Sequence, residues 1–131
     1  MMLIAAAFRW LRWGRVPLRL RRRYRLVVDT RASPSVLARF AHDRNVLVRR
    51  AAARNHSTPP GALELLSHDR DYPVRSWVAQ HPGTPPAVLA RLLDDPKAAV
   101  ARAAVLNPHL PRASLVRWQL AHNQAIPSGH S

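Results

Sequence analysis

Arginine is the residue type best able to do chemistry in this chain. The sequence holds 21 Lys+Arg residues against 7 Asp+Glu residues, which gives a formal net charge of +14. A guanidinium group binds phosphate and carboxylate oxygens in a bidentate manner, and it stacks on flat rings. A surface with this excess of positive charge attracts polyanions. The predicted polyanion-binding residues are Arg22, Arg23, Arg25, Arg49, Arg50, Arg75 and Arg102.

Three of these arginines form a regular row. Arg23, Arg49 and Arg75 follow one another at a constant interval. On stacked helices about 8 to 10 Å apart they could follow a phosphate backbone. In the alternative interpretation the arginines belong to the fold and pair with acids of their own unit. That pairing would join Asp43 to Arg49, and Asp69 to Arg75.

Tryptophans accompany the arginines near the N-terminus. Trp10 and Trp13 alternate with arginines in residues 1–25, a mixture suited to phosphate contact with base stacking or to the headgroups of an anionic membrane. Trp77 stands where the neighbouring units carry small residues. It either fills a gap in the core or offers a stacking surface. These three tryptophans are the predicted stacking or interface residues.

The sequence offers little for catalysis or for cofactors. It has no cysteine, which excludes thiolate nucleophiles and cysteine-bound metals. His42 and His68 occupy equivalent positions, but a metal site needs three or four convergent ligands. No glycine-rich phosphate loop and no nucleophile elbow occurs. We therefore expect a non-enzymatic protein with no cofactor, no metal and no small-molecule substrate.

The elements that must position these residues recur with one fixed period. Leu37, Leu63, Leu89 and Leu115 are evenly spaced at this period, and such self-similarity is typical of repeat architectures. Each unit indicates two short helices, each with one narrow apolar stripe. Stripes of this width are buried only when consecutive units stack. The predicted fold class is all-α, an α-solenoid of three to four 26-residue two-helix repeats.

Three capping columns predict where the helices begin and end. A threonine before proline is expected to cap the first helix of a unit, and an aspartate is expected to cap the second. An asparagine or histidine is expected to end the second helix. The columns are, in that order, Thr58 and Thr84; Asp43, Asp69 and Asp95; and Asn55, His81 and Asn107.

Two segments resemble a known family. They run from Val74-Arg75 through His81-Pro82-Gly83-Thr84-Pro85-Pro86 to Leu89, and from Val100 through Asn107-Pro108 to Leu115. Both resemble the bacterial variant leucine-rich repeat, which is loosely similar to HEAT repeats, and the match covers about residues 32–121. The resemblance implies a right-handed superhelix in which the second helix is sometimes 3₁₀. The longer units here favour two α-helices, and the cysteine-free chain cannot hold the iron-sulfur cluster of some relatives.

Three regions are predicted along the chain. Residues 1–31 form a basic N-terminal segment that could be a degenerate capping repeat, residues 32–121 form the helical repeat domain, and residues 122–131 form a disordered tail. The opening apolar run is too short to span a bilayer, and its arginines follow it, unlike those of an export signal. The predicted location is the cytoplasm, with the inner membrane face as the alternative.

The predicted function is a binding scaffold whose basic face recognises a polyanion, either nucleic acid or an acidic protein. The alternative is a protein-interaction adaptor that residues 1–25 hold at an anionic membrane surface. A minor alternative rests on a fold-level resemblance to HEAT-like DNA glycosylases, with Asp71 as the acid and Trp77 as the stacking ring.

Overall fold

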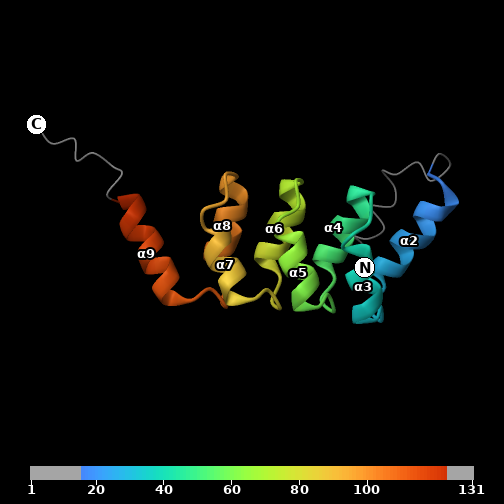
Figure 1. The fold of residues 1–131 in the computed structure, drawn as a ribbon, viewed down its shortest axis with the longest axis horizontal. Helices are drawn as coiled ribbons and strands as arrows, with labels where there is room; N and C mark the ends of the chain where they lie inside the picture. The colour runs from blue at the N-terminus through green and yellow to red at the C-terminus, as the bar shows by residue number, and fades with distance from the viewer. Residues whose placement is uncertain (1–15, 124–131) are drawn as a thin grey trace, which may run out of the picture.

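The fold is a single row of stacked helices (Figure 1). The computed structural model describes residues 16–123, in which every regular element is an α-helix. The row runs from α2 at one end to α9 at the other. The helices are α2 (Leu18–Val28), α3 (Pro34–Phe40), α4 (Val46–Arg54), α5 (Pro60–Leu66), α6 (Tyr72–Gln80), α7 (Pro86–Leu92), α8 (Ala98–Leu106) and α9 (Arg112–Asn123).

Short and long helices alternate along the row. Helices α3, α5 and α7 have 7 residues each, whereas α4, α6 and α8 have 9 each. Each long helix packs on the next long helix, so that α2 contacts α4, α4 contacts α6 and α6 contacts α8. Each short helix packs on the long helix that follows it. The predicted α-solenoid is confirmed, and both helices of a unit are α-helices.

The apolar columns of the repeat form the core. Leu37, Leu63 and Leu89 are completely buried, and burying a leucine side chain contributes about 2 kcal/mol. One continuous cluster of buried residues extends from Val27 in α2 to Ala104 in α8. Each unit therefore completes its core against its neighbours. The valine column is buried in the same way, at Val48, Val74 and Val100.

The aspartate column does not cap the long helices directly, so that prediction is wrong. These carboxylates accept the backbone N–H two residues ahead, at 2.8 to 2.9 Å. A carboxylate that closes such a turn is used before the helix begins. The N-cap positions belong instead to Asn45 and Asp71, whose side chains accept N–H groups of the first turn. The turn-forming residues are Asp43, Asp69 and Asp95.

The threonines do not cap the short helices that follow them, so this prediction is also wrong. The hydroxyls of Thr58 and Thr84 donate, at 2.5 Å, to the carbonyls of Ala52 and Val78. These carbonyls belong to the last turn of the preceding long helix, which leaves acceptors free. The two prolines after each threonine occupy the N-cap and the first helical position. A proline has no N–H to be capped there.

The predicted terminators of the long helices are confirmed as C-caps, and they also join the units. Asn55 Nδ2 donates to the carbonyl of Asp29 at 3.0 Å, His81 Nε2 contacts the carbonyl of Asn55 at 2.7 Å, and Asn107 Nδ2 donates to the carbonyl of His81 at 3.1 Å. Each residue of the column thus bonds to the backbone of its equivalent one unit earlier. A spine of hydrogen bonds runs along the stack.

His81 takes the place of an asparagine in this spine. Its Nδ1 accepts the Gly83 N–H at 2.9 Å, so the proton lies on Nε2, which donates to Asn55. Burial lowers the pKa of His81, although the hydrogen bond to the Asn55 carbonyl opposes the shift. The ring is therefore neutral at pH 7.

The two ends of the chain extend beyond the described residues. Helix α2 lies on α4 as α4 lies on α6, and residues 1–15 of the predicted N-terminal segment lie outside the described part. The predicted tail starts too early, because His122 and Asn123 belong to α9, while residues 124–131 are outside the description. Helix α9 has 12 residues. Ala121 occupies the aspartate column and cannot form the turn that ends the other short helices.

Candidate polyanion interface

The arginine row forms ion pairs between successive units. Each arginine reaches a carboxylate 20 residues ahead, in the turn of the next unit. The row therefore ties α2, α4 and α6 each to a turn further along the stack. The pairs are Arg23 with Asp43 at 3.0 Å, Arg49 with Asp69 at 2.6 Å and Arg75 with Asp95 at 2.7 Å.

The alternative prediction, in which each arginine pairs with the carboxylate of its own unit, is wrong. Within its own unit Arg49 donates to the backbone carbonyl of Asp43, at 2.9 Å, and its carboxylate partner is Asp69. Arg75 repeats this arrangement with the carbonyl of Asp69, at 2.8 Å. The guanidinium spans two turns because stacking brings the turn of the next unit beside the long helix.

Arg49 and Arg75 are consequently internal. Their side chains are 11% and 14% exposed, and those of Asp69 and Asp95 are 7% and 5% exposed. Hydrogen bonds that Arg49 donates to Asp69 raise the pKa of Arg49, because a carboxylate favours the charged guanidinium. Arg23 is more open, with 43% of its side chain exposed. Arg49 and Arg75 therefore hold the units together and present little guanidinium surface to a ligand.

Arg50 and Asp71 make a second kind of ion pair between units. Arg50 Nε and Nη2 lie 2.8 and 2.9 Å from the two carboxylate oxygens of Asp71, and Asp71 also caps α6. The hydrogen bonds from Arg50 lower the pKa of Asp71, so this carboxyl group holds no proton at neutral pH. Asp71, the candidate acid of a glycosylase, is thus part of the fold.

Three predicted residues stay available to a ligand. Arg22 and Arg25 on α2 and Arg102 on α8 are exposed. None of them forms an ion pair within residues 16–123. The structure therefore divides the predicted set into arginines held in ion pairs and exposed arginines without an ion pair in the described part of the chain.

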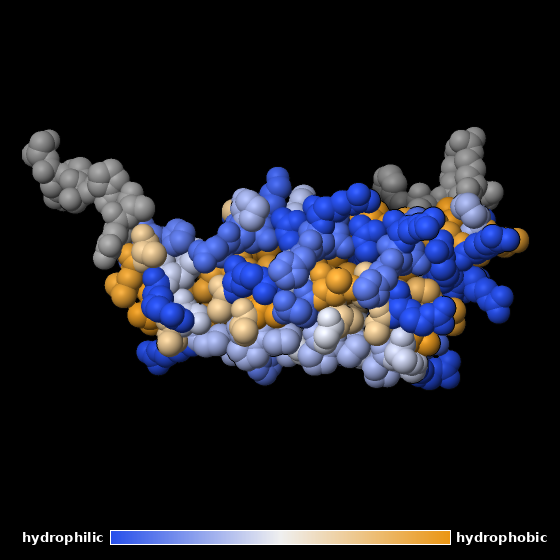
Figure 2. All heavy atoms as spheres, in the orientation of Figure 1, coloured by the Kyte–Doolittle hydropathy of each residue, from blue (hydrophilic) through white to orange (hydrophobic). Residues whose placement is uncertain are grey.

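The sequence interpretation missed Arg44 and Arg70. Both are exposed and lie at equivalent positions of adjacent turns, and with Arg49 and Asp69 they line a hollow of about 370 Å³. The signal in the sequence was their spacing, which equals one repeat period and places them at equivalent positions. Hydrophilic side chains crowd the upper long edge of the molecule in Figure 2, above a band of apolar residues.

Trp77 packs against the core, and an arginine side chain lies over its ring. Its half-buried ring packs against the core, and the guanidinium of Arg54 lies 4.5 Å from the ring centroid. A cation at this distance is attracted by the face of the ring. Trp10 and Trp13 lie outside the described residues.

One family model matches the central part of this stack. The model of the leucine rich repeat variant matches residues 46–71 and 72–97. These two segments are the central units of the stack, and they are shorter than the resemblance over residues 32–121. Residues 46–97 therefore carry two leucine rich repeat variants. No curated protein and no solved structure matches the chain.

The family match divides the chain at the N-cap of each long helix. A leucine-rich repeat variant here consists of a long helix followed by a short one and its turn, as in α4 with α5 and α6 with α7. In this division Arg49 with Asp69, and Arg75 with Asp95, lie within one matched segment, and each pair ties the long helix to the turn that closes the same segment. The protein is accordingly a helical repeat scaffold.

Residues 16–123 hold neither a cluster of metal ligands nor a helix that could span a membrane. Among residues 16–123, no three histidine, aspartate or glutamate side chains gather as ligands of one metal ion. His68, which a metal site would have used, lies 3.4 Å from Glu64 on its own helix. No described helix is both long enough and apolar enough to span a bilayer.

Proposed function

We propose that the protein is a binding scaffold whose exposed arginines recognise a polyanion, with nucleic acid as the first candidate. The observation that carries the proposal is that ion pairs within the fold already occupy nearly all of the acidic residues. Of the 7 acidic residues, Asp94 alone makes no ion pair in the described part of the chain. The other pairs beyond those named above are Arg31 with Asp29 and Arg91 with Glu64.

This pairing leaves the remaining positive charge without compensation. Arg22 and Arg25 on α2, and Arg44 and Arg70 on the turns, are exposed and make no ion pair with a described carboxylate. Guanidinium groups on successive units of a rigid stack can contact several phosphates at once. Because contacts to phosphates carry no sequence information, we expect binding with little sequence preference.

The test is the salt dependence of binding to a labelled DNA duplex, followed by fluorescence anisotropy. The wild-type chain is compared with the variant R22Q/R25Q and with R44Q/R70Q. Each lost phosphate contact reduces the slope of log affinity against log salt by about 0.9. We expect weaker binding and a shallower slope for both variants. The matched control R39Q/R117Q removes the same charge from exposed positions of α3 and α9, and it should behave as wild type.

Several outcomes would overturn the proposal. Equal losses in all three variants would mean that net charge alone attracts DNA. Absence of binding at physiological salt would remove nucleic acid, and binding to anionic vesicles in its place would support the membrane-held adaptor. Substitution of Arg49 is not a suitable test, because its pair with Asp69 holds two units together.

A further inference from the structure

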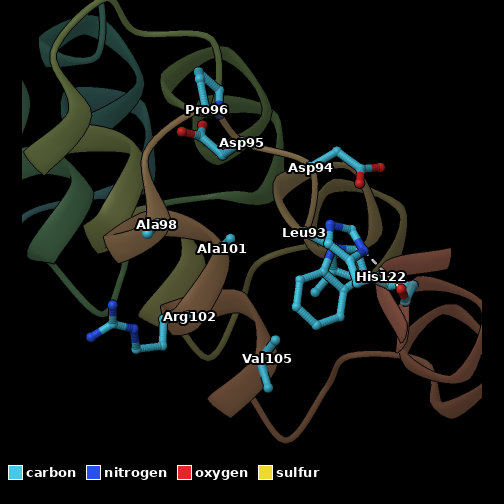
Figure 3. Close-up of a pocket in the computed structure, with 10 residues that line it drawn as sticks. Leu93, Asp94, Asp95, Pro96, Ala98, Ala101, Arg102, Val105 and His122 are labelled. Carbon is cyan, nitrogen blue, oxygen red and sulfur yellow. Dashed lines mark hydrogen bonds between the residues drawn. The ribbon is translucent and has the colours of Figure 1, made fainter. Parts of the chain in front are cut away.

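A groove lies at the end of the stack, between α8 and α9 (Figure 3). Its volume is about 530 Å³. Ala101 and Val105 of α8 form one wall, Trp118 and His122 of α9 form the other, and Asp94 of the preceding turn stands at its edge. Arg102 also borders the groove, but its guanidinium points away from His122.

At the groove one ion pair of the row is missing. In the three preceding units an arginine on the long helix crosses to an aspartate 20 residues ahead. At the fourth unit these two positions are Ala101 and Ala121. Both partners are absent together, so neither leaves an unpaired buried charge. The space that a guanidinium fills elsewhere is open.

The acceptors that surround such a guanidinium are still in place. Arg75 donates from Nη1 to the backbone carbonyls of Asp69 and Arg70, at 2.8 and 3.3 Å. The equivalent carbonyls belong to Asp95 and Pro96, both of which line the groove. The side chain at the arginine position there is Ala101, which has no donor.

Two further features of the groove suit a cation. Asp94 is exposed and is the one carboxylate within residues 16–123 without an ion-pair partner. The rings of Trp118 and His122 lie 4.2 Å apart, and an indole face attracts cations. The Nε1–H of Trp118 is buried and has no hydrogen-bond partner in the described part of the chain.

We propose that this groove binds an arginine side chain of a partner protein, which takes the place of the missing member of the arginine row. The guanidinium lies between the carbonyls of Asp95 and Pro96 and the carboxylate of Asp94. Its planar fork of donors fits two carbonyls better than an ammonium group does. The formal charge of +14 opposes association of two copies, so the arginine comes from another protein.

The first experiment titrates the ¹⁵N-labelled full-length chain with N-acetyl-arginine amide. The readout is the indole N–H resonance of Trp118, assigned with the variant W118F. We expect a saturable shift of this resonance, a weaker response to N-acetyl-lysine amide, and no response to the citrulline analogue. Citrulline has the shape of arginine without its charge. An equal response to citrulline, or no response to arginine, would overturn the proposal.

Two variants separate the groove from general charge effects. The variant A101R/A121D supplies both missing partners from within the chain, so it should abolish the response to arginine amide. Its matched control is A99R, because Ala99 is exposed on α8 and does not line the groove. The control should bind as wild type. D94N should weaken binding of arginine while leaving the circular dichroism of the chain unchanged.

Analytical ultracentrifugation decides the source of the arginine. A monomer at all concentrations agrees with a partner protein. Self-association that A101R/A121D abolishes would instead assign the groove to a second copy and overturn our choice of partner. The outcome is independent of nucleic-acid binding, because none of these variants removes an exposed arginine.

Discussion

At the scale of single residues, the role of an arginine here depends on which residue the next unit places beside it. Where that residue is an aspartate, the arginine becomes an internal ion pair, as Arg75 does with Asp95. Where no acid is near, as for Arg22, it stays exposed. One residue type therefore serves both cohesion between units and the proposed binding surface.

The internal pairs should contribute far more to stability than the exposed ones. We expect Arg75→Met to lower the free energy of unfolding by about 3 kcal/mol, because it leaves the buried carboxylate of Asp95 without its ion-pair partner. Arg31→Met is the matched control, since Arg31 is 90% exposed in its pair with Asp29, and it should cost less than about 1 kcal/mol. Urea unfolding followed by circular dichroism measures both, and equal effects would contradict the structural role of the row.

The His81 ring restricts which side chain position 83 can carry. A Cβ atom at Gly83 would lie 3.2 Å from both Cε1 and Nδ1 of His81, and the ring is fixed by two hydrogen bonds. The backbone of Gly83 does not need glycine for its dihedral angles, since no described glycine has a positive φ. In the asparagine units the same position is Ser57 or His109, so asparagine tolerates a Cβ there.

This dependence predicts non-additive substitutions. Gly83→Ala should destabilise the wild-type chain by about 1 kcal/mol through overpacking, and it should be neutral or stabilising in the His81→Asn background, where the backbone entropy gain remains. A double-mutant cycle from thermal unfolding gives the coupling between the two positions. Additive effects would show that the ring can move aside.

At the scale of elements, the junction between a long helix and the next short one is closed by a hydroxyl. Thr84 is 3% exposed and Thr58 is 4% exposed, and each donates back to the last turn of the long helix before it. The prolines that follow start the short helix without further capping. The threonine therefore fixes the angle between two elements.

Replacing this hydroxyl by a methyl group should cost the same at both junctions. Thr58→Val and Thr84→Val each remove one hydrogen bond and preserve the side-chain shape, so we expect a loss of about 1 kcal/mol in either case. Thr30→Val is the control, because Thr30 is exposed in the loop after α2. Unequal values at the two junctions, measured by urea unfolding, would contradict the equivalence of the units.

The repeat period was enough to predict the elements and the core, because apolar spacing along one helix depends only on local geometry. The valine column and Leu37, Leu63 and Leu89 of the leucine column are therefore buried as expected, whereas Leu115 on the terminal helix α9 is only partly buried. The caps were less predictable, since Asp69 and Asp71 are chemically alike and the turn decides which one is the N-cap. The partner of Arg49 depends on how units stack, which no spacing within one unit contains.

At the scale of the whole molecule, acid should weaken two of the ion pairs between units, Arg50 with Asp71 and Arg75 with Asp95. Hydrogen bonds from Arg50 lower the pKa of Asp71. Burial raises the pKa of Asp95, but the hydrogen bonds from Arg75 and the Lys97 N–H outweigh it and lower the pKa overall. Such carboxylates stabilise the fold above the pKa of an unfolded aspartate, about 3.9. This stability is lost as the pH falls through the lower pKa of the folded state.

We therefore expect the thermal midpoint to fall steeply below about pH 4, where these carboxylates take up protons while the arginines keep their charge. The variant D71N should show a weaker dependence in this range, because one of the titrating groups is removed. Differential scanning calorimetry over a series of pH values measures both chains. A wild-type midpoint that stays constant between pH 5 and pH 2 would contradict a role for the carboxylates.

The reach of each arginine to a carboxylate 20 residues ahead also bears on how such a chain can lengthen. Tandem duplication of a 26-residue segment inserts a unit whose arginine meets the next carboxylate and whose own carboxylate meets the preceding arginine. An insertion of any other length puts these partners out of register and leaves a charge unpaired. Growth by whole copies is thus tolerated and growth by fragments is penalised, which favours variation in copy number over variation in repeat length.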